Sequence, residues 1–424
     1  MSGAAFDAVV VGGGPAGATA AALLARAGHS VALVEKARHP RFHIGESLLP
    51  ATMPLLERLG VLEEVRALGV RKRGADFTAA DGRSQAITFA HVMRGSAAEG
   101  AVQVERARFD DLLFRRAVGC GAVPFEGATA RVEGLAGEVR LVLKGADGGE
   151  VRLAARELID ASGRDGLLAR HLDLRVADPN HQSAAVFGHY RGAGFREGER
   201  EGNISLYWFQ HGWIWMIPLP DGVMSVGAVF PPACLKRREG PLDAFLEATL
   251  RMAPEVAARL EGARRLGPAH AASNYSYGAS RMYGANWCLA GDAFAFVDPV
   301  FSSGVHFALQ SAFFAADAVA ARLGGERNVE RRFADAERRV RRGLAAMSWL
   351  IHRFNEPAMR HLFLNRRDVL GIEAALLRLL AGDVFHRQGI DVRYALFKGI
   401  YGLARLGLRF DPAPEPPPQP ARAG

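Results

Sequence analysis

The chain has 424 residues, of which 49% are apolar and 23% are charged, and this supplies enough apolar surface for one large or two ordinary hydrophobic cores. Its formal net charge is +8, but the basic residues are spread along the chain and form no stripe interleaved with aromatic residues, so we expect no nucleic-acid binding. Before residue 411 there is no repeat, heptad run or low-complexity tract, which excludes fibrous and solenoid architectures. Only five lysines stand against 48 arginines, so each lysine calls for a specific explanation.

The cysteine pattern and the chain ends bear on the compartment. Cys120, Cys234 and Cys288 have no paired spacing, so we expect neither a disulfide framework nor a metal site, and we expect a reducing, cytoplasmic location. The N-terminus carries no basic and then apolar leader, and no apolar run reaches the roughly 18 residues of a spanning helix, so we expect neither secretion nor membrane insertion. Six prolines fall between residues 411 and 424, and we expect this tail to be disordered.

The first segment predicts a dinucleotide-binding turn. A strand is expected over 6–11, a Gly-Gly-Gly-Pro-Ala-Gly turn over 12–17, a helix to about residue 27, and a second strand over 30–34 that ends in Glu35. The first glycine permits the turn, the second lets the backbone approach a pyrophosphate, and the third lets helix and strand pack closely. Glu35 would hold a ribose hydroxyl. The expected phosphate-binding glycines are Gly12, Gly14 and Gly17.

Two later strands end in loops at the edge where open α/β sheets bind ligands. Strands are expected over 157–160, running into Ala-Ser-Gly-Arg, and over 287–289, running into Ala-Gly-Asp-Ala. The intervening region, about 176–270, is richer in short strands and indicates a separate antiparallel layer. Its expected strands include 208–218 and 223–229, and segments near 76–100 could join it.

The last quarter of the chain predicts helices. An apolar helix is expected from Gly304 to about residue 323, followed by an arginine-dense stretch over 326–342 and further helices to about residue 409. The predicted fold class is α/β, with a Rossmann-like nucleotide-binding domain, an inserted antiparallel β-sheet substrate layer and a C-terminal helical region. The expected parts are a core over 1–330, with the sheet layer at about 76–100 and 176–270, a helical region over 331–410, and the tail over 411–424.

The glycine turn, the loop after Asp160 and the Gly-Asp pair at 291–292 together resemble the FAD-binding core of the FAD-dependent monooxygenase superfamily, over about residues 5–330. The resemblance implies bound FAD, with the Asp292 carboxylate on the flavin ribitol. It also implies that an arginine ahead of a Phe-Asp pair contacts the cofactor. Arg106 is the better match and Arg108 the alternative.

Two motifs resemble flavin-dependent halogenases more narrowly. Trp-Ile-Trp-Met-Ile-Pro at 213–218 matches the family's Trp-x-Trp-x-Ile-Pro signature, although a tryptophan pair on a strand is most often core packing. The segment 296–304 matches the family's Phe-x-x-Pro-x-x-Ser-x-Gly pattern. The resemblance implies that the backbone amides of Ser303 and Gly304 bind halide beside the flavin. The alternative is an ordinary serine N-cap.

Two further features point to the branch of that family that acts on phenols and pyrroles. The loop Phe-His-Ile-Gly-Glu-Ser-Leu-Leu-Pro at 42–50 resembles the loop after the second strand in those enzymes. Lys72 stands where the family places its essential lysine, although a charged residue there is ordinarily a solvated surface group. A desolvated amine can lose its proton and guanidinium cannot, and Arg71 and Arg73 would ease that loss if they approach. Lys72 would either hydrogen-bond hypohalous acid or become a haloamine.

One position departs from the related tryptophan halogenases. They carry a glutamate three residues before the glycine of the halide loop, and this chain has Phe301 there. A substrate activated by its own hydroxyl or pyrrole nitrogen has less need of that carboxylate, which favours the phenol and pyrrole branch. Segments 353–357 and 380–385 resemble the helical extension of the phenolic branch.

The resemblance therefore implies FADH2- and O2-dependent halogenation, with chloride or bromide, of an electron-rich aromatic substrate, through a flavin hydroperoxide, hypohalous acid and Lys72. No second glycine fingerprint is present for a nicotinamide, so a separate NAD(P)H-dependent flavin reductase is expected. Arginines over 331–342 form either a solvated helix face or a docking surface for an acidic carrier protein that bears the substrate. The rival functions are an aromatic hydroxylase or double-bond reductase of the same fold, and a nucleotide-binding protein without redox turnover. The implied cofactor-binding residues are Gly12, Gly14, Ala16, Gly17, Glu35, Lys36, Ser47, Arg106, Asp160, Asp292, Pro299, Gly304 and Val305.

Overall fold

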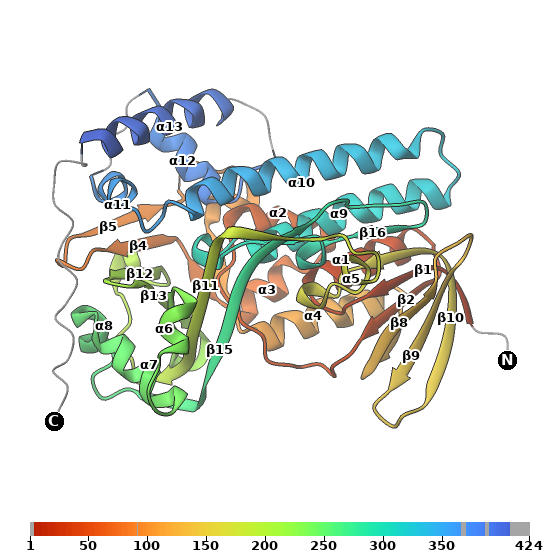
Figure 1. Cartoon of the computed structure of the whole chain (residues 1–424), viewed down its shortest axis with the longest axis horizontal. Helices are drawn as coiled ribbons and strands as arrows, with labels where there is room; N and C mark the ends of the chain where they lie inside the picture. Colours follow the sequence, from red (N-terminus) through yellow and green to blue (C-terminus); the bar gives the residue numbers. More distant parts are fainter. Residues whose placement is uncertain (1–3, 91, 366–369, 386–389, 408–424) are drawn as a thin grey trace.

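The computed structural model of the chain describes residues 4–90, 92–365, 370–385 and 390–407. The proline-rich tail expected to be disordered lies outside these residues. Two β-sheets stand at opposite ends of the molecule, and the long strands β11 and β15 run between them (Figure 1). The α/β fold class is confirmed, because a Rossmann-like sheet, a second sheet and a helical C-terminal region are all present.

The first sheet forms the nucleotide-binding half. Strand β1 pairs in parallel with β2 and β10, and β10 pairs with β9 along its first half and with β16 along its last three residues. The alternating strand and helix pattern at the N-terminus is thus confirmed, since a strand, a glycine turn, a helix and a parallel strand follow one another. The strands of this sheet are β1 (Ala4–Val11), β2 (Val31–Glu35), β7 (Val123–Glu126), β8 (Ala128–Gly134), β9 (Val139–Gly145), β10 (Glu150–Asp160) and β16 (Trp287–Leu289).

The second sheet is largely antiparallel and contains the expected substrate layer strands. The segment expected as one strand over 208–218 is instead a hairpin, because Gln210 and His211 form a tight turn between β12 and β13. Segments near 76–100 do join the sheet, since β4 pairs with β12 and β5 pairs with β4. In spatial order the strands are β17 (Ala295–Phe296), β15 (Arg264–Ala279), β11 (Arg175–Arg191), β14 (Val223–Phe230), β13 (Gly212–Leu219), β12 (Ile204–Phe209), β4 (Gly74–Thr78) and β5 (Ser84–Thr88). A separate two-stranded ribbon joins β3 (Val70–Lys72) to β6 (Ala101–Gln103).

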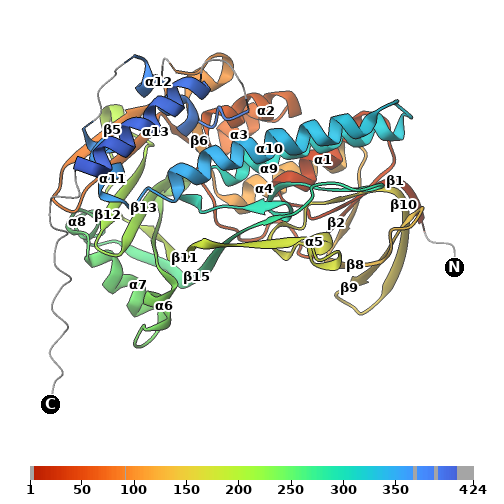
Figure 2. The ribbon, with the colours of Figure 1, turned by 45° about the horizontal axis from the view of Figure 1, so that its top comes forward.

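Helices cover the faces of both sheets. Helix α1 packs against α4 and α9 over the first sheet, and α6, α7 and α8 lie along the second (Figures 1 and 2). The helices that precede the C-terminal region are α1 (Pro15–Arg26), α2 (Met53–Leu59), α3 (Leu62–Leu68), α4 (Arg106–Gly119), α5 (Leu167–His171), α6 (Pro232–Lys236), α7 (Leu242–Arg251) and α8 (Pro254–Arg259).

The C-terminal region is helical and closes over the second sheet. Helix α10 lies alongside α9, and α11, α12 and α13 gather beyond its far end, beside β4 and β5 (Figure 2). Helix α9 is long and apolar enough to cross a membrane, contrary to the sequence expectation, but 67% of its most apolar stretch is buried, so it serves as a core helix. These helices are α9 (Gly304–Leu323), α10 (Val329–Ile351), α11 (Pro357–Leu364), α12 (Ile372–Leu380) and α13 (Ile390–Gly407).

Candidate active site

The glycine turn after β1 has the close packing that a dinucleotide-binding cradle needs. Gly12 has a φ of +107°, and a Cβ there would lie 2.1 Å from the carbonyl oxygen of Ala161. A Cβ on Gly17 would lie 1.7 Å from the carbonyl oxygen of Gly12, so α1 touches the turn directly. At Gly14 the nearest atom to an added Cβ is an Arg41 nitrogen at 3.5 Å, which leaves this backbone open. The geometry separates two structural glycines from one that faces free space.

Glu35 and Lys36 end β2 beside this turn. The Glu35 carboxylate accepts hydrogen bonds from the backbone amides of Gly13, at 2.7 Å, and Ala37, at 2.9 Å. Glu35 thus fixes the glycine turn, and its expected contact with a ribose hydroxyl remains a prediction. Lys36 is exposed and pairs with Asp165, so its ammonium group lies on the surface.

The Gly-Asp motif meets the same cradle from the other side. A Cβ on Gly291 would approach the Ala16 side chain at 3.0 Å, so residues about 275 positions apart are adjacent. The partly buried Asp292 carboxylate makes no hydrogen bond to another described side chain, and burial raises its pKa to about 6. A carboxylate in this state fits a ligand hydroxyl that donates to it.

Asp160 lies at the end of β10, where the next loop begins. Its carboxylate is fully buried and accepts hydrogen bonds from the backbone amides of Ser162, at 2.9 Å, and Leu168, at 2.7 Å. Those bonds fix the loop that follows β10. The structure therefore shows Asp160 holding its own loop, and its contact with a cofactor is a prediction without support from this geometry.

Arg106, at the start of α4, lies inside the molecule, whereas the alternative Arg108 is exposed. The Arg106 guanidinium makes a bidentate ion pair with Asp110, at 2.8 and 3.0 Å, and donates to the carbonyl oxygen of Ile44 at 2.9 Å. Burial opposes ionisation of Asp110, but Arg106 and Arg41 outweigh it and hold the pKa of Asp110 below its usual value. Arg106 thus anchors the 42–50 loop, in agreement with its selection over Arg108.

Lys72, the last residue of β3, is buried with 2% exposure. Its Nζ donates to Ser47 Oγ at 2.9 Å and to the carbonyl oxygen of Leu48 at 3.1 Å, and it lies 5.5 Å from the centre of the Phe89 ring. None of the described acidic side chains pairs with it. The solvated-surface alternative for Lys72 is therefore wrong.

Burial alone sets the charge state of this lysine. It lowers the pKa of Lys72 from 10.5 to about 7, because a desolvated ammonium without a counter-ion is unfavourable. Arg71 and Arg73 are both exposed on the other side of the strand, so the expected help from neighbouring cations is not part of the cause. Burial therefore makes the neutral amine accessible near neutral pH.

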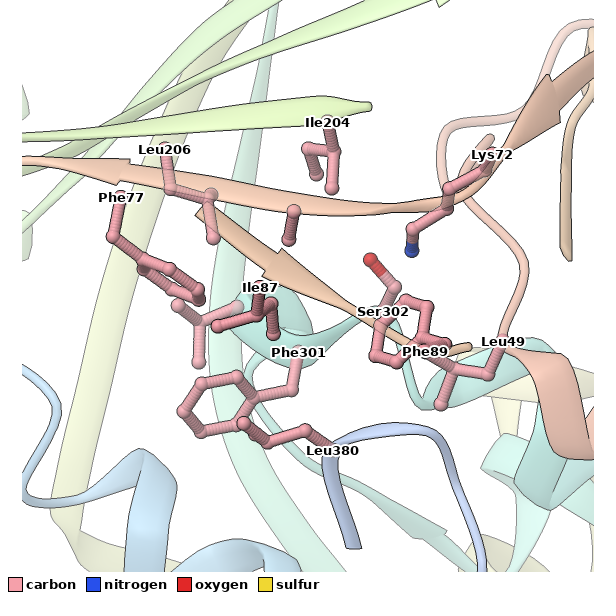
Figure 3. A pocket seen from close by; sticks show the side chains of 12 residues that line it. Leu49, Lys72, Phe77, Ile87, Phe89, Ile204, Leu206, Phe301, Ser302 and Leu380 are labelled. Carbon is pink, nitrogen blue, oxygen red and sulfur yellow. The ribbon is translucent and has the colours of Figure 1, made fainter. Parts of the chain in front are cut away.

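Lys72 faces the Phe-x-x-Pro-x-x-Ser-x-Gly segment across a small cavity. Figure 3 shows the Lys72 nitrogen and the Ser302 hydroxyl pointing toward one another, with Phe301 further along the wall. The cavity is about 20 Å³, which is room for about one water molecule. Its described lining residues are Leu49, Lys72, Ala75, Phe77, Ile87, Phe89, Ile204, Leu206, Val300, Phe301, Ser302 and Leu380. Among them Lys72 is the one ionisable group.

The serine that precedes α9 does not cap the helix. Ser303 makes no side-chain capping bond, and its hydroxyl, with 1% exposure, has no hydrogen-bond partner among the described residues. The N-cap alternative is therefore wrong. Ser302 adopts the left-handed conformation, with a φ of +58°, and turns the chain into α9. The turn contains Pro299, and the first residues of α9 are Gly304 and the buried Val305.

The tryptophan pair lies on β13, in the interior of the second sheet between β12 and β14. Trp213 and Trp215 are 4% and 6% exposed, their ring centres are 5.9 Å apart, and Trp215 donates to Ser225 Oγ at 3.1 Å. The core-packing role is thus present. Trp213 also lines a second, larger cavity, whereas neither tryptophan lines the cavity beside Lys72.

Several residues around these sites had no signal in the sequence. Leu48 contributes only its carbonyl oxygen, and Phe89 only its ring face, so neither has a recognisable pattern. Arg41 pairs with Asp110 and approaches Glu35 at 3.6 Å, and Leu380 reaches the Lys72 cavity from α12. Leu380 lies in the 380–385 segment that resembles the phenolic branch, which was the one available sign of it.

Comparison with known proteins gives the family. The FAD binding domain family matches residues 5–349. A tryptophan 2-halogenase of Chondromyces crocatus is 36% identical over 327 residues, which is 75% of this chain and 62% of that protein; the chain thus spans less than two thirds of this relative. A 1H-pyrrole-2-carbonyl-[peptidyl-carrier protein] chlorinase of Pseudomonas fluorescens is 31% identical over 416 residues, or 91% of both chains.

Similarity to solved structures agrees with this. The myxobacterial chondrochloren halogenase superimposes with a TM-score of 0.78 and 31% identity, over 95% of this chain and 97% of that one. The glycine cradle, the Gly-Asp motif and the buried lysine occur on a chain that is similar to halogenases over nearly its whole length. The chain therefore belongs to the flavin-dependent halogenases, oxidoreductases built on an FAD-binding domain.

Proposed function

We propose that this chain halogenates an electron-rich aromatic ring, phenolic or pyrrolic, with chloride or bromide as the halogen source. The observation that carries the proposal is the placement of Lys72, an amine that is buried and free of any described acidic partner, so that burial lowers its pKa to about 7. Such an amine can accept a hydrogen bond from hypohalous acid or attack its halogen. Both routes need the neutral form that burial provides.

The described residues fit bound FAD. Gly12, Gly14 and Gly17 would seat the pyrophosphate, Asp292 would accept from a ribitol hydroxyl, and Arg106 holds the 42–50 loop in place. Ser47 would link that loop to the reaction centre, since its hydroxyl accepts from Lys72. When bound, reduced FAD would supply two of the four electrons that reduce O2, and halide would supply the other two as it is oxidised to hypohalous acid.

The chain's own groups would then bind halide and deliver the oxidised halogen. The unpartnered Ser303 hydroxyl and the first amides of α9 lie next to the Lys72 cavity in sequence and space, and helix N-terminal amides favour an anion. The apolar wall excludes water from the oxidant. Lys72 would finally take the proton that leaves the ring, because it is the one ionisable group among the described residues that line this cavity.

Phe301 supports the phenol and pyrrole branch. Its ring packs on Phe354 and Phe363, with centres 5.3 and 6.2 Å apart, so the position that carries a glutamate in tryptophan halogenases is apolar here. Without that carboxylate, a ring activated by its own oxygen or nitrogen is the better substrate. The related pyrrole chlorinase acts on a carrier-bound pyrrole, which supports a substrate of this chemical class.

The proposed partners are a separate NAD(P)H-dependent flavin reductase and, for a tethered substrate, a carrier protein. The arginine-dense helix gives little support to carrier docking, because four of its six arginines over 331–342 pair with acids of this chain. These pairs are Arg332 with Glu326 and Asp317, Arg338 and Arg339 with Asp335, and Arg341 with Glu337. The three cysteines are free thiols, which supports the proposed reducing cytoplasm.

The test compares Lys72→Ala with the wild-type protein in the presence of reduced FAD, O2, bromide and a panel of phenols and pyrroles. The variant is expected to lose halogenated product while FAD binding and bromide-dependent oxidation persist. Lys398→Ala is the matched control, because burial also lowers the pKa of Lys398 and it contacts the Trp349 ring, yet it lies outside the cavity. An active Lys72→Ala enzyme would refute the assignment, and halide-independent hydroxylation would favour the rival function.

A further inference from the structure

A second cavity, of about 330 Å³, opens between strand ends of the second sheet, at the β12–β13 turn and the end of β14, and the connection from α10 to α11. Unlike the Lys72 cavity it is mixed in character, with amide, imidazole and guanidinium groups beside aromatic rings. Its volume suits part of an organic ligand. Its polar described lining residues are Gln182, Ser183, Gln210, His211, Asp298, His352, Asn355 and Arg360.

Arg360, on α11, faces this cavity without a described counter-ion. It is half-buried, and its Nε is inaccessible to solvent and has no hydrogen-bond acceptor among the described residues. Its guanidinium lies 5.8 Å from the centre of the Trp208 ring, and Trp208 Nε1 is a second buried donor that lacks a described acceptor. Arg360 Nε, a buried donor without a described acceptor in a residue that lines this cavity, indicates a place for an oxygen-bearing anion.

The acids of this region are engaged elsewhere. Asp298 accepts from Ser183 Oγ at 2.6 Å and from the backbone amide of Val300 at 3.1 Å. Asp178 pairs with His352 at 3.3 Å. Since both carboxylates have their own donors, Arg360 keeps its charge available for a ligand.

One face of β12 connects the two cavities. Ile204 and Leu206 line the Lys72 cavity, and Trp208 continues the same face toward Arg360. Trp213, which lines the second cavity, is the cross-strand partner of Trp208. Four residues of strand separate Ile204 from Trp208, which corresponds to about 13 Å. A ligand that reaches both sites is therefore extended.

Phe354 stands between the two cavities. Its side chain is 1% exposed, lines the second cavity, and packs at 5.3 Å on Phe301 and 4.9 Å on Trp208. The Lys72 cavity holds about one water molecule, so a ring can enter only if a neighbouring side chain moves. Val300 lines both cavities, and movement of Phe354, which packs on Phe301 in the wall of the first, would widen the connection between them.

We propose that Arg360 binds an oxyanion that the aromatic substrate carries at a distance from its reacting ring, and so selects elongated, anionic substrates. This inference rests on the proposed halogenase function, because it assumes that the ring reaches Lys72. Two substrate classes present this chemistry, namely the phosphate of a phosphopantetheine thioester and the carboxylate of a long-chain aromatic acid. Arg360 acts as a specificity residue and takes no part in the halogen transfer.

The test measures binding, by quenching of tryptophan fluorescence, without turnover. One pair of probes is the phosphopantetheine thioester of pyrrole-2-carboxylate and the pantetheine thioester that lacks the phosphate. The other pair is 6-(4-hydroxyphenyl)hexanoate and its neutral amide. Wild-type protein is expected to prefer at least one anionic probe over its neutral partner, and Arg360→Gln is expected to weaken that probe about tenfold or more while changing the neutral one less than twofold.

Two further variants test whether the loss of affinity in Arg360→Gln is a purely structural effect. Arg360→Lys retains the charge and should recover part of the affinity. Arg353→Gln removes a nearby guanidinium that donates to the carbonyl oxygen of Trp349 and does not line the cavity, and it should leave all affinities unchanged. If Arg360→Gln loses affinity only for the phosphate-bearing probe, the ligand is derived from a carrier protein. If it loses affinity only for the carboxylate probe, the ligand is a free acid.

Three results overturn the inference: no preference for either anionic probe, equal loss of anionic and neutral probes in Arg360→Gln, or no binding of any anionic probe to the wild-type protein. Failure of the proposed function is a separate outcome, because it is read from Lys72-dependent halogenation. Arg360→Gln is expected to halogenate neutral phenols at wild-type rates, because Arg360 takes no part in halogen transfer, so this rate reports the proposed function independently of the binding result.

Discussion

Replacing Lys72 with methionine should abolish halogenation and stabilise the protein at neutral pH. A lysine whose pKa falls from 10.5 to about 7 on folding opposes folding by about 5 kcal/mol at or below pH 7. Methionine fills similar space without a charge, but it leaves Ser47 Oγ and the Leu48 carbonyl oxygen without their donor, at a cost of about 1–3 kcal/mol. The expected net gain at pH 7 is about 2–4 kcal/mol.

The pH dependence distinguishes this explanation from ordinary core repacking. The penalty is complete below the folded pKa of Lys72, shrinks as the pH rises toward 10.5, and vanishes above it. Between pH 7 and pH 9 the advantage of methionine should therefore shrink by about 3 kcal/mol. Guanidinium unfolding at both values measures it, with the exposed Lys144→Met as control. A Lys72→Met protein that is destabilised equally at both pH values would refute the reasoning.

Three further outcomes are expected. Ser303→Ala removes a buried hydroxyl that has no described partner, so the unfolding free energy measured with denaturant should change by less than about 0.5 kcal/mol. The bromide concentration for half-maximal turnover should rise several-fold. An unchanged bromide dependence would contradict halide binding at Ser303. Phe301→Glu places a carboxylate against the Phe354 ring and should cost about 3–5 kcal/mol in unfolding free energy, whereas equal stability would mean that water reaches the site. Gly17→Ala should disrupt the fold, as measured by circular dichroism, because its Cβ would meet a backbone oxygen at 1.7 Å. Gly14→Ala, whose Cβ would have its nearest atom at 3.5 Å, should keep the fold and weaken FAD binding in a fluorescence titration. The opposite order of effects would contradict the assigned glycine roles.

Local rules were sufficient for the N-terminal half of the fold. The glycine turn, the helix to Arg26 and the strand that ends in Glu35 follow from backbone conformations that few residues other than glycine adopt. The apolar helix from Gly304 to Leu323 was equally clear, since its start is set by the turn before it. These features depend on neighbours in sequence, which is why one chain was enough.

Features that depend on distant partners were not predictable. The 208–218 segment was expected as one strand because Gln210 and His211 are not typical hairpin residues. Burial of Lys72 results from the packing of the 42–50 loop, β4 and the C-terminal helices around it. The sequence suggested the lysine only by its rarity and by resemblance, and it also suggested a role for Arg71 and Arg73 that their exposure rules out.

The second cavity lay beyond any sequence signal. Arg360 and Trp208 are about 150 residues apart, and nothing in either segment marks a ligand. Their significance comes from two buried donors, Arg360 Nε and Trp208 Nε1, that have no described acceptors, and from the Arg360 guanidinium, which lies over the Trp208 ring. Such an arrangement is a property of packed side chains, and only the three-dimensional structure contains it.

The central claim is that this protein uses reduced FAD and O2 to oxidise halide. The most direct test needs no natural substrate: protein with reduced FAD, O2 and bromide is mixed with phenol red, and brominated dye is measured together with hydrogen peroxide. We expect protein-dependent bromination of the dye that requires both FAD and bromide. Hydrogen peroxide as the sole product, at a rate indifferent to bromide, would contradict the account.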